Sequence, residues 1–388
     1  MQPRIRLTLW YICFLAAVGA FHPYLAVVLD DAGASGAQQA AILSLFPLGS
    51  IFAGPGLTWL ADRTGRSILV LRLSIGLTAV AAVTLAAGVT LWWMIASIAL
   101  LSFARAPSSS IVDMLTAKQL GMGKTGYGGV RAWGSVGFIA AASGVGLLLH
   151  RGSEVALQVH AILLLTLVFL TYALPTGRAT PPQRERGSIA AVLKKPILLS
   201  LYGVGILHQS TIAFYDHFFA LHVTKTLDSG AWIASASIAL GVGLEVIVLA
   251  KSHRLLQRFG PGLLIVVAIV SGVPRWILTA STEHPLLLIL VQALHGLGFG
   301  AWWVGAIALV DRHAPGQLRN SAQGLFMAST HGLGNLVAMG CAWLLLDRSS
   351  TTAVFLSSGL LSAFAALGCF VFLLPALRRS TMSQSPSS

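Results

Sequence analysis

Apolar runs of helix length recur from one end of the chain to the other, with short polar connectors between them. An α-helix rises about 1.5 Å per residue, so about 20 apolar residues are enough to cross the roughly 30 Å hydrocarbon core of a bilayer. We therefore expect an all-α membrane protein with twelve transmembrane helices. The expected spans are 7–29, 37–60, 68–88, 91–112, 129–149, 155–174, 198–223, 230–251, 261–281, 285–310, 320–346 and 351–375.

The composition agrees with a chain that lies in a lipid bilayer. Only 10% of the 388 residues are charged, whereas a soluble domain has about 25%. The formal net charge of +13 does not indicate nucleic-acid binding, because the basic residues are spread over the connectors and form no clustered basic face. Cys13, Cys341 and Cys369 lie inside apolar runs and are expected to be packing residues. The sequence predicts no cofactor and no metal site.

The distribution of Lys and Arg predicts the orientation. Twenty of these 25 residues lie at the chain ends or in the even-numbered connectors with the immediately adjoining helix ends, three lie in the odd-numbered connectors, and Arg105 and Arg275 lie inside spans. Because cytoplasmic loops carry an excess of basic residues, both termini are predicted to be cytoplasmic, in a multi-pass protein of the plasma membrane such as the bacterial inner membrane. The run 7–29 begins like a secretory signal but continues to Leu29, so we interpret it as the first membrane helix.

The chain is predicted to consist of two six-helix bundles. A linker rich in Pro and charge, 175–197, separates an N-terminal bundle (1–174) from a C-terminal bundle (198–376), and residues 377–388 form a disordered cytoplasmic tail. The segment "LADRTGR" (60–66) aligns with "LLQRFGP" (255–261) at an offset of 195 residues, close to half the chain. A repeat of equal halves is typical of transporters that hold a central site between two bundles.

Four ionisable side chains are predicted inside the spans: Arg105, Asp216, Glu245 and Arg275. Each costs at least ~2.5–3.5 kcal/mol at a helix centre, so such groups face the protein interior and find partners. Their positions along alternating helices place Arg105 and Glu245 in the cytoplasmic half and Asp216 and Arg275 in the external half. Two interpretations stay open: salt bridges that hold the bundle, or arginines that bind an anionic substrate once a carboxylate is protonated.

The tenth span carries an unusual polar and aromatic pattern. Gln292, His295, Phe299 and Trp302 follow i, i+3, i+7 and i+10 spacing and are expected to share one helical face. Such a face suits a wet cavity with aromatic walls, or alternatively a packed interface between helices. The glycines of "GLGFG" (296–300) follow no strand, so they predict close helix packing and not a nucleotide site.

The motif "LADRTGR" resembles the connector motif of the major facilitator superfamily, with Asp62, Arg63, Gly65 and Arg66 in place. The chain resembles the phenylpropionate permease group, relatives of lactose permease and the nucleoside–proton symporters. The segments that carry this resemblance are "GVRAWGSVGF" (129–138), "ALGVGLEV" (239–246), "GVPRWILTA" (272–280), "QALHGLGFGAWWVGAIALVDRHAP" (292–315) and "NSAQGLFMASTHGLGN" (320–335).

The resemblance implies two six-helix pseudo-repeats around a central cavity, with Arg131 joining the gating motif. In lactose permease, a similar ninth-span Arg and tenth-span His belong to the substrate and proton machinery, so Arg275 and His295 are expected to do so here. The acidic residue that accompanies that His is missing. Spans 1, 4, 7 and 10 line the cavity in that family, which adds His208 and Tyr215 of the seventh span as candidates.

The sequence therefore predicts a secondary transporter, with proton-coupled uptake of a small organic carboxylate, aromatic ones included. A nucleoside or sugar symporter and a drug exporter stay open as alternatives, whereas the chain has no signature of an enzyme. Its predicted partners are the substrate, protons and the bilayer, and a monomer is favoured. The candidate substrate residues are Arg275, His295, Gln292, Trp302, Tyr215, His208 and Arg105, and the candidate proton-coupling residues are Glu245 and Asp216.

Overall fold

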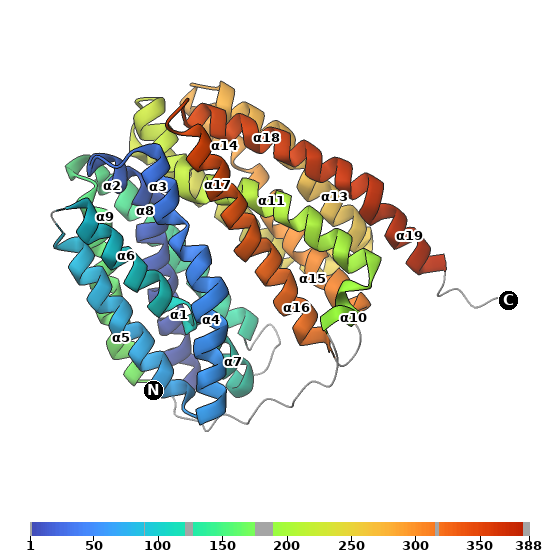
Figure 1. The fold of residues 1–388 in the computed structure, drawn as a ribbon, viewed down its shortest axis with the longest axis horizontal. Coiled ribbons are helices and arrows are strands. Elements are labelled where there is room, and N and C mark those ends of the chain that lie inside the picture. The colour runs from blue at the N-terminus through green and yellow to red at the C-terminus, as the bar shows by residue number, and fades with distance from the viewer. Residues whose placement is uncertain (1, 89, 121–126, 175–188, 315–317, 383–388) are drawn as a thin grey trace. The chain divides into compact units, whose positions relative to one another are not determined.

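The computed structural model describes residues 2–88, 90–120, 127–174, 189–314 and 318–382. Every regular element in these ranges is helical (Figure 1). The first half holds α1 (Pro3–Phe21), η1 (His22–Tyr24), α2 (Leu25–Asp31), α3 (Gly36–Leu43), α4 (Leu45–Thr64), α5 (Ser67–Ala86), α6 (Leu91–Arg105), α7 (Ser108–Leu120), α8 (Tyr127–Leu148), η2 (Leu149–Arg151) and α9 (Glu154–Tyr172).

The second half begins with α10 (Ile189–Leu193), a short helix that precedes the seventh span. The remaining elements are α11 (Pro196–Leu221), η3 (His222–Thr226), α12 (Ala231–Ala250), α13 (Ser252–Ser281), α14 (Pro285–Val291), η4 (Gly296–Ala301), α15 (Trp302–His313), α16 (Arg319–Met327), η6 (Ala328–Gly334), α17 (Asn335–Leu345), α18 (Thr351–Gly368), η7 (Cys369–Leu373) and α19 (Leu374–Met382). The segments η3, η4, η6 and η7 are π-helical.

The predicted membrane spans are confirmed as helices. Eleven helical stretches of the described residues are long and apolar enough to cross a membrane. The remaining predicted span, 320–346, corresponds to α16, η6 and α17, which follow one another without a break from Arg319 to Leu345. The described part of the chain therefore contains a helical segment for each of the predicted spans.

The backbone supports the internal repeat that the sequence indicated. Gly65 ends α4 with φ 64°, and Gly260, exactly 195 positions later, interrupts α13 with φ 70°. A second pair at the same offset is Gly33, with φ 80°, and Asp228, with φ 46°. Only Gly adopts this left-handed region without steric cost, and Asp tolerates it better than most residues. Both halves thus place a residue with positive φ at equivalent points, although ψ differs between Gly65 (17°) and Gly260 (164°).

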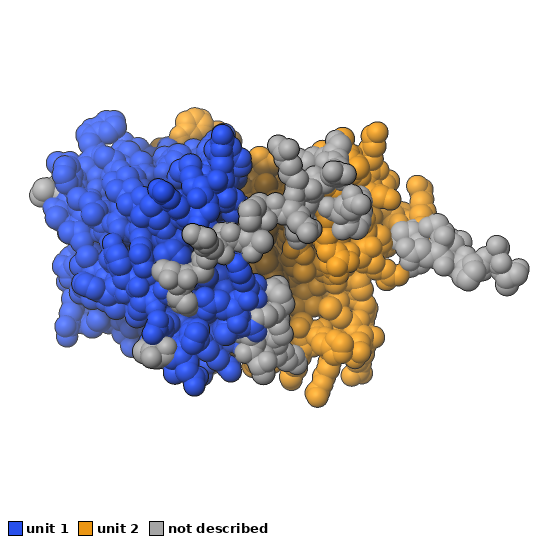
Figure 2. Space-filling model, turned by 90° about the horizontal axis from the view of Figure 1, so that it is seen from below, with its two compact units in different colours: residues 1–183, 216–239 blue, residues 184–215, 240–388 orange. Residues whose placement is uncertain are grey.

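The chain divides into two compact units (Figure 2). Unit 1 comprises residues 1–183 and 216–239, and unit 2 comprises residues 184–215 and 240–388. These units differ from the two predicted bundles, because residues 216–239 of α11, η3 and α12 belong to unit 1. The predicted bundle boundaries stay a prediction, and the predicted tail and most of the predicted linker lie outside the described residues.

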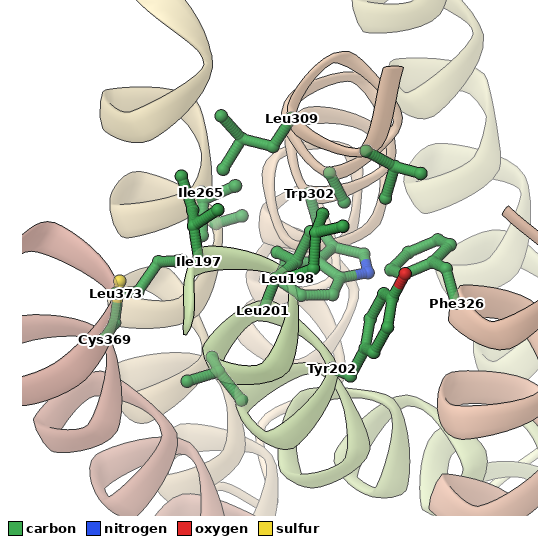
Figure 3. Packing of buried hydrophobic residues seen from close by; sticks show 14 of the residues in the cluster. Ile197, Leu198, Leu201, Tyr202, Ile265, Trp302, Leu309, Phe326, Cys369 and Leu373 are labelled. Atoms are coloured by element: carbon green, nitrogen blue, oxygen red, sulfur yellow. The ribbon is translucent and has the colours of Figure 1, made fainter. Parts of the chain in front are cut away.

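The core of unit 2 surrounds the indole of Trp302, which is fully buried. Tyr202 of α11 and Phe326 of α16 face it, and Leu198 and Leu201 pack beside it (Figure 3). The Tyr202 hydroxyl donates a hydrogen bond of 2.8 Å to the carbonyl oxygen of Ala322, so its polar end is satisfied inside the core. This packing fixes α11, α15 and α16 around the helices that carry the candidate site.

Candidate functional site

The guanidinium of Arg275 is the buried charge of unit 2. Arg275 lies on α13 with 1% of its surface exposed, and its Nε donates a hydrogen bond of 3.0 Å to Oε1 of Gln292. The centre of the guanidinium lies 4.4 Å from the ring centroid of Tyr215 and 4.0 Å from that of Trp276. Aromatic faces attract a cation, and the attraction is strongest where water is excluded. Two aromatic rings and an amide oxygen therefore surround the Arg275 guanidinium inside unit 2.

Gln292 is oriented by partners on both ends of its amide. Its Nε2 donates to Oγ1 of Thr279 at 3.0 Å, and the Thr279 hydroxyl donates to the Arg275 carbonyl oxygen at 2.8 Å. The amide oxygen therefore points to Arg275. Because Gln292 is fully buried, the packed interface that the sequence left open as an alternative describes this residue in the structure. Its role in substrate binding stays a prediction.

His295 and Glu245 bring a titratable pair next to this arginine. Nε2 of His295, before η4, lies 3.4 Å from Oε2 of Glu245 on α12. The side chains are 6% and 14% exposed. The His295 ring also lies 5.4 Å from the ring of Tyr215, which is the ring that contacts Arg275. Four predicted residues, Arg275, Tyr215, His295 and Glu245, are thus brought together.

A π-helical turn changes the face that the tenth span presents. The rings of His295 and Phe299 stack with 5.7 Å between centroids, and those of Phe299 and Trp303 stack at 6.0 Å. Trp303 also meets the His331 ring edge-on at 5.7 Å. The expectation that Trp302 shares this face is wrong, because η4 widens the helical turn between Phe299 and Trp302. The aromatic row therefore continues to Trp303.

Trp302 instead packs against His208 of α11. Their ring centroids are 4.9 Å apart, and Nε2 of His208 lies 2.9 Å from the carbonyl oxygen of Gly298. Both side chains are buried. This contact fixes η4 against α11, and a role of either residue as a substrate ligand stays a prediction.

The glycines of η4 allow close contact with α12, as the sequence predicted. A Cβ atom on Gly296 would lie 2.8 Å from the Leu244 carbonyl carbon, and one on Gly300 would lie 3.0 Å from Val248. Likewise, a Cβ atom on Gly241 of α12 would lie 3.0 Å from the His295 Cβ atom. The backbone approach that places His295 beside Glu245 therefore depends on these glycines.

Arg105, a cationic residue of unit 1 at the end of α6, lies among aromatic and histidine side chains. Its guanidinium is 5.5 Å from the Phe46 ring. The rings of His22 and His217 are 5.8 Å apart, and the charge of Arg105 acts on both. Asp216, next to His217 on α11, is exposed. Arg105 therefore lies in a buried imidazole cluster, which the sequence did not predict.

Comparisons with known proteins identify the family. Residues 4–357 match the model of the MFS_1 like family. The chain belongs to this family of major facilitator transporters. It is a secondary transporter and not an enzyme, so the predicted superfamily, fold and broad class are confirmed.

The transporter is similar to the maltose permease of Geobacillus stearothermophilus, with 27% identity over 97% of this chain and 95% of the relative. It is also 27% identical to the probable 3-phenylpropionic acid transporter of Escherichia coli (strain K12), over 74% of this chain and 77% of the relative. Among solved structures, the nucleoside transporter NupG superposes with a TM-score of 0.81 at 19% identity, covering 96% of this chain and 99% of NupG.

The gating motif of the transporter lies where α4 turns into α5. Gly65 supplies the left-handed residue after Thr64, and Arg63 lies over the Trp59 ring at 5.1 Å. Asp62 lies in the last turn of α4 and Arg66 caps α5. Helices often end at a residue in the left-handed conformation, and Gly adopts it at the lowest steric cost, which explains Gly at position 65. The gating role of these residues stays a prediction.

Arg131 of the transporter belongs to a polar group that the sequence did not reveal. Its guanidinium lies 5.8 Å from the Tyr11 ring, and the Tyr11 hydroxyl donates a hydrogen bond to the carboxylate of Asp113. Tyr127 also bonds to Asp113. Asp113 was missed because the predicted fourth span ended at residue 112, whereas α7 continues to Leu120. A carboxylate one residue beyond a predicted span is the signal that would have revealed it.

The other missed residues are histidines within apolar runs. Nδ1 of His160 on α9 lies 2.8 Å from the Ala17 carbonyl oxygen, and its ring stacks on Phe21 at 4.2 Å. His217 follows the predicted Asp216 directly. The pairings of Arg105 with Glu245 and of Asp216 with Arg275, which the predicted depths permitted, stay predictions.

Proposed function

We propose that the transporter couples protons to the uptake of a small organic carboxylate, including aromatic ones. The observation that supports this function best is the contact of Arg275 with the Tyr215 ring. The same ring contacts His295, which in turn lies next to Glu245. An arginine recognises a carboxylate by paired N–H donors, and aromatic rings contribute apolar contact to an aromatic substrate.

The substrate carboxylate is proposed to interact with Arg275 directly or through Tyr215 and Gln292. The row of His295, Phe299 and Trp303 offers stacking surfaces beside this position. In an alternating-access cycle, the buried arginine becomes available when the elements around it move. Arg105, His208 and Trp302 complete the proposed set of substrate residues.

The proton is proposed to bind at Glu245 next to His295, with Asp216 as the competing site. An unpaired carboxylate in an apolar environment favours its protonated form, whereas a neighbouring cation favours its ionised form. Substrate-linked movement of Arg275 relative to the pair of Glu245 and His295, or a change in the access of water to that pair, therefore changes the proton affinity of Glu245. This linkage is what proton-coupled uptake requires.

A second candidate function is the uptake of a neutral sugar or nucleoside. It is favoured by two relatives that match nearly the whole chain, the maltose permease in sequence and NupG in fold. For a neutral substrate, Arg275 and Gln292 donate and accept hydrogen bonds with hydroxyl groups. A drug exporter of the same fold is a further alternative, as multidrug resistance protein MdtG is also a relative.

The test is uptake into proteoliposomes with an imposed inward proton gradient. We expect accumulation of 3-phenylpropionate to exceed that of maltose and uridine, and to disappear when a protonophore collapses the gradient. Empty liposomes correct for diffusion of the protonated acid. Gradient-driven uptake of maltose or uridine without uptake of the acid would assign the second function instead.

The orientation is proposed from the basic residues: both termini and the midpoint linker face the cytoplasm of a plasma membrane, the inner membrane in a bacterium. In a variant whose native cysteines are replaced, Gln183→Cys should react with an impermeant maleimide only after the cells are opened. Thr226→Cys, which is exposed at the end of η3, should react in intact cells. Labelling of both positions from one side would contradict this orientation. The monomer is proposed as the working unit.

A further inference from the structure

Unit 2 has a cavity outside the candidate transport site, at the end where α11 begins and α15 and α19 end. Its volume is about 640 Å³. Three cationic residues line it from three separate segments, Lys195, Arg312 and Arg379, and His313 lies beside Arg312 in the lining. None of the described residues that line it is acidic. The cavity therefore combines an electropositive lining with a volume that accommodates a ligand group.

The opposite wall of this cavity is apolar. Val371 and Phe372 of η7 line it and remain 51% and 63% exposed. Ile197, another residue of the lining, belongs to the buried core of unit 2 (Figure 3). In a membrane protein, exposed apolar side chains of this kind face the acyl chains of the bilayer. The cavity thus lies at the level where lipid chains meet the polar interface.

We propose that this cavity binds an anionic phospholipid. The phosphate of the headgroup would interact with Lys195, Arg312 and Arg379, and the hydroxyl of Ser200 adds a hydrogen-bonding group to the lining. An acyl chain would lie along Val371 and Phe372. A basic pocket between membrane helices is the recognised form of a site for acidic headgroups, and the cytoplasmic leaflet, where this end is predicted to lie, supplies them.

The amphipathic lining favours a lipid over a free phosphate. A soluble anion gains nothing from the exposed ring of Phe372, whereas a phospholipid covers that ring and brings its phosphate to the basic residues at the same time. A bound lipid would also link α11, α15 and α19, which approach one another around the cavity. This inference does not depend on which solute is transported.

The experiment measures thermal unfolding of the purified transporter in dodecyl maltoside during titration with phosphatidylglycerol or phosphatidylcholine. We expect a saturable rise in Tm with phosphatidylglycerol and a much smaller one with phosphatidylcholine. In the variant Lys195→Gln/Arg312→Gln/Arg379→Gln, the affinity for phosphatidylglycerol should fall by about a hundredfold, since each of the three basic residues contributes about fivefold near an anionic lipid. An unchanged titration in this variant would overturn the proposal.

The matched control is Lys251→Gln/Arg254→Gln/Arg258→Gln, which removes the same charge from exposed residues around the start of α13. It should keep the wild-type titration, and an equal loss of affinity would show that the cavity is not the site. The single variant Arg379→Gln, at an exposed position, repeats the test with less risk to folding. The Tm in phosphatidylcholine alone reports the folded state of each variant.

Two further arms distinguish a lipid from a free anion. Phe372→Ser should weaken phosphatidylglycerol binding, whereas Phe364→Ser, at a ring that is 59% exposed on α18, should not. Inorganic phosphate and glycerol 3-phosphate should not raise Tm at the lipid concentrations that saturate the effect. If inorganic phosphate or glycerol 3-phosphate raises Tm, and the triple cavity variant abolishes that rise, the site binds free phosphate and the assignment to a lipid is wrong.

Discussion

Nε2 of His295 lies 3.4 Å from Oε2 of Glu245, and both side chains are largely shielded from solvent. This contact joins the segment before η4 to α12. The Tyr215 ring contacts both the His295 ring and the Arg275 guanidinium, so it lies between the contact and Arg275. A carboxylate in such surroundings is sensitive to small changes in the position of neighbouring cations. The contact therefore makes Glu245 the first residue to test for proton coupling.

Glu245→Gln mimics a permanently protonated carboxylate at similar volume. We expect the variant to lose uphill accumulation and its pH dependence but to keep substrate exchange, because exchange does not require the empty carrier to release a proton. With one proton for each substrate anion, the wild-type transporter should reach about tenfold accumulation for each unit of pH gradient. The variant should reach only equilibration in the same proteoliposomes.

Asp216→Asn is the matched control for this prediction, since Asp216 is the other candidate carboxylate and is exposed on α11. It should keep gradient-dependent accumulation. If Glu245→Gln accumulates substrate and Asp216→Asn does not, the proton site belongs on α11. If both variants accumulate like the wild type, proton coupling by these carboxylates loses its support.

Removal of the Arg275 side chain should impair binding of the acid more than binding of a neutral ligand. In Arg275→Ala, we expect at least a tenfold loss of affinity for the carboxylate and a loss of about 1–3 kcal/mol of stability, because the buried Gln292 oxygen loses its donor. Arg275→Lys restores the charge without the planar donor arrangement, so it should recover stability better than affinity. Isothermal titration and thermal unfolding measure the two effects.

An arginine outside the site provides the control for Arg275. Arg348→Ala removes an exposed guanidinium at the end of the eleventh span. It should change neither affinity nor Tm. Unchanged affinity in both Arg275 variants would leave that residue with a structural role alone.

The two neighbouring tryptophans should respond differently to truncation. Trp302 fills the core of unit 2, so Trp302→Ala should cost about 3–5 kcal/mol of stability. Trp303 continues the stack of His295 and Phe299, so Trp303→Ala should mainly lower affinity for aromatic substrates. Comparison of Tm with the affinities for an aromatic and an aliphatic acid measures this difference. A selective loss of aromatic affinity in Trp302→Ala, with Tm unchanged, would reverse the assignment.

The positions with positive φ predict substitutions whose effects on stability have opposite signs. Gly33→Ala should destabilise the transporter by about 1–2 kcal/mol, because no neighbour lies within 4 Å of the added Cβ atom and the cost is purely that of the backbone. Asp228→Gly, at the equivalent position, should be neutral or slightly stabilising. Gly76→Ala, inside α5 with open space around it, should stabilise the helix by up to about 1 kcal/mol. Equal Tm shifts for the two glycine substitutions would contradict this explanation.

The spans and the repeat were predictable because they depend on local properties of the sequence. Hydrophobic runs of bilayer length predict helices wherever they occur, and the aligned segments place a glycine with positive φ at the same position, Gly65 and Gly260. The group of Arg275, Gln292 and His295 was also predictable, since isolated polar residues in apolar helices point to the protein interior.

The rest of the site depends on packing that no single helix encodes. The turn at η4 forms against α12, so the regular spacing that predicted Trp302 fails and Trp303 takes its place. The approach of His22 to His217 joins residues nearly two hundred positions apart, which periodicity within either helix does not reveal. Asp113 was missed for a simpler reason, the uncertain end of a predicted span.

The glycines at the contact between α12 and η4 have a consequence for how the transporter moves. A Cβ atom added to Gly241, Gly296 or Gly300 would lie 2.8–3.0 Å from the neighbouring segment, so the two segments are packed closely along this contact. We therefore expect α12 and η4 to move as one rigid body during the transport cycle, so that the distance between Glu245 and His295 stays constant. The bending that opens the binding site must then occur in other helices, and what changes around the carboxylate–imidazole pair is its access to water.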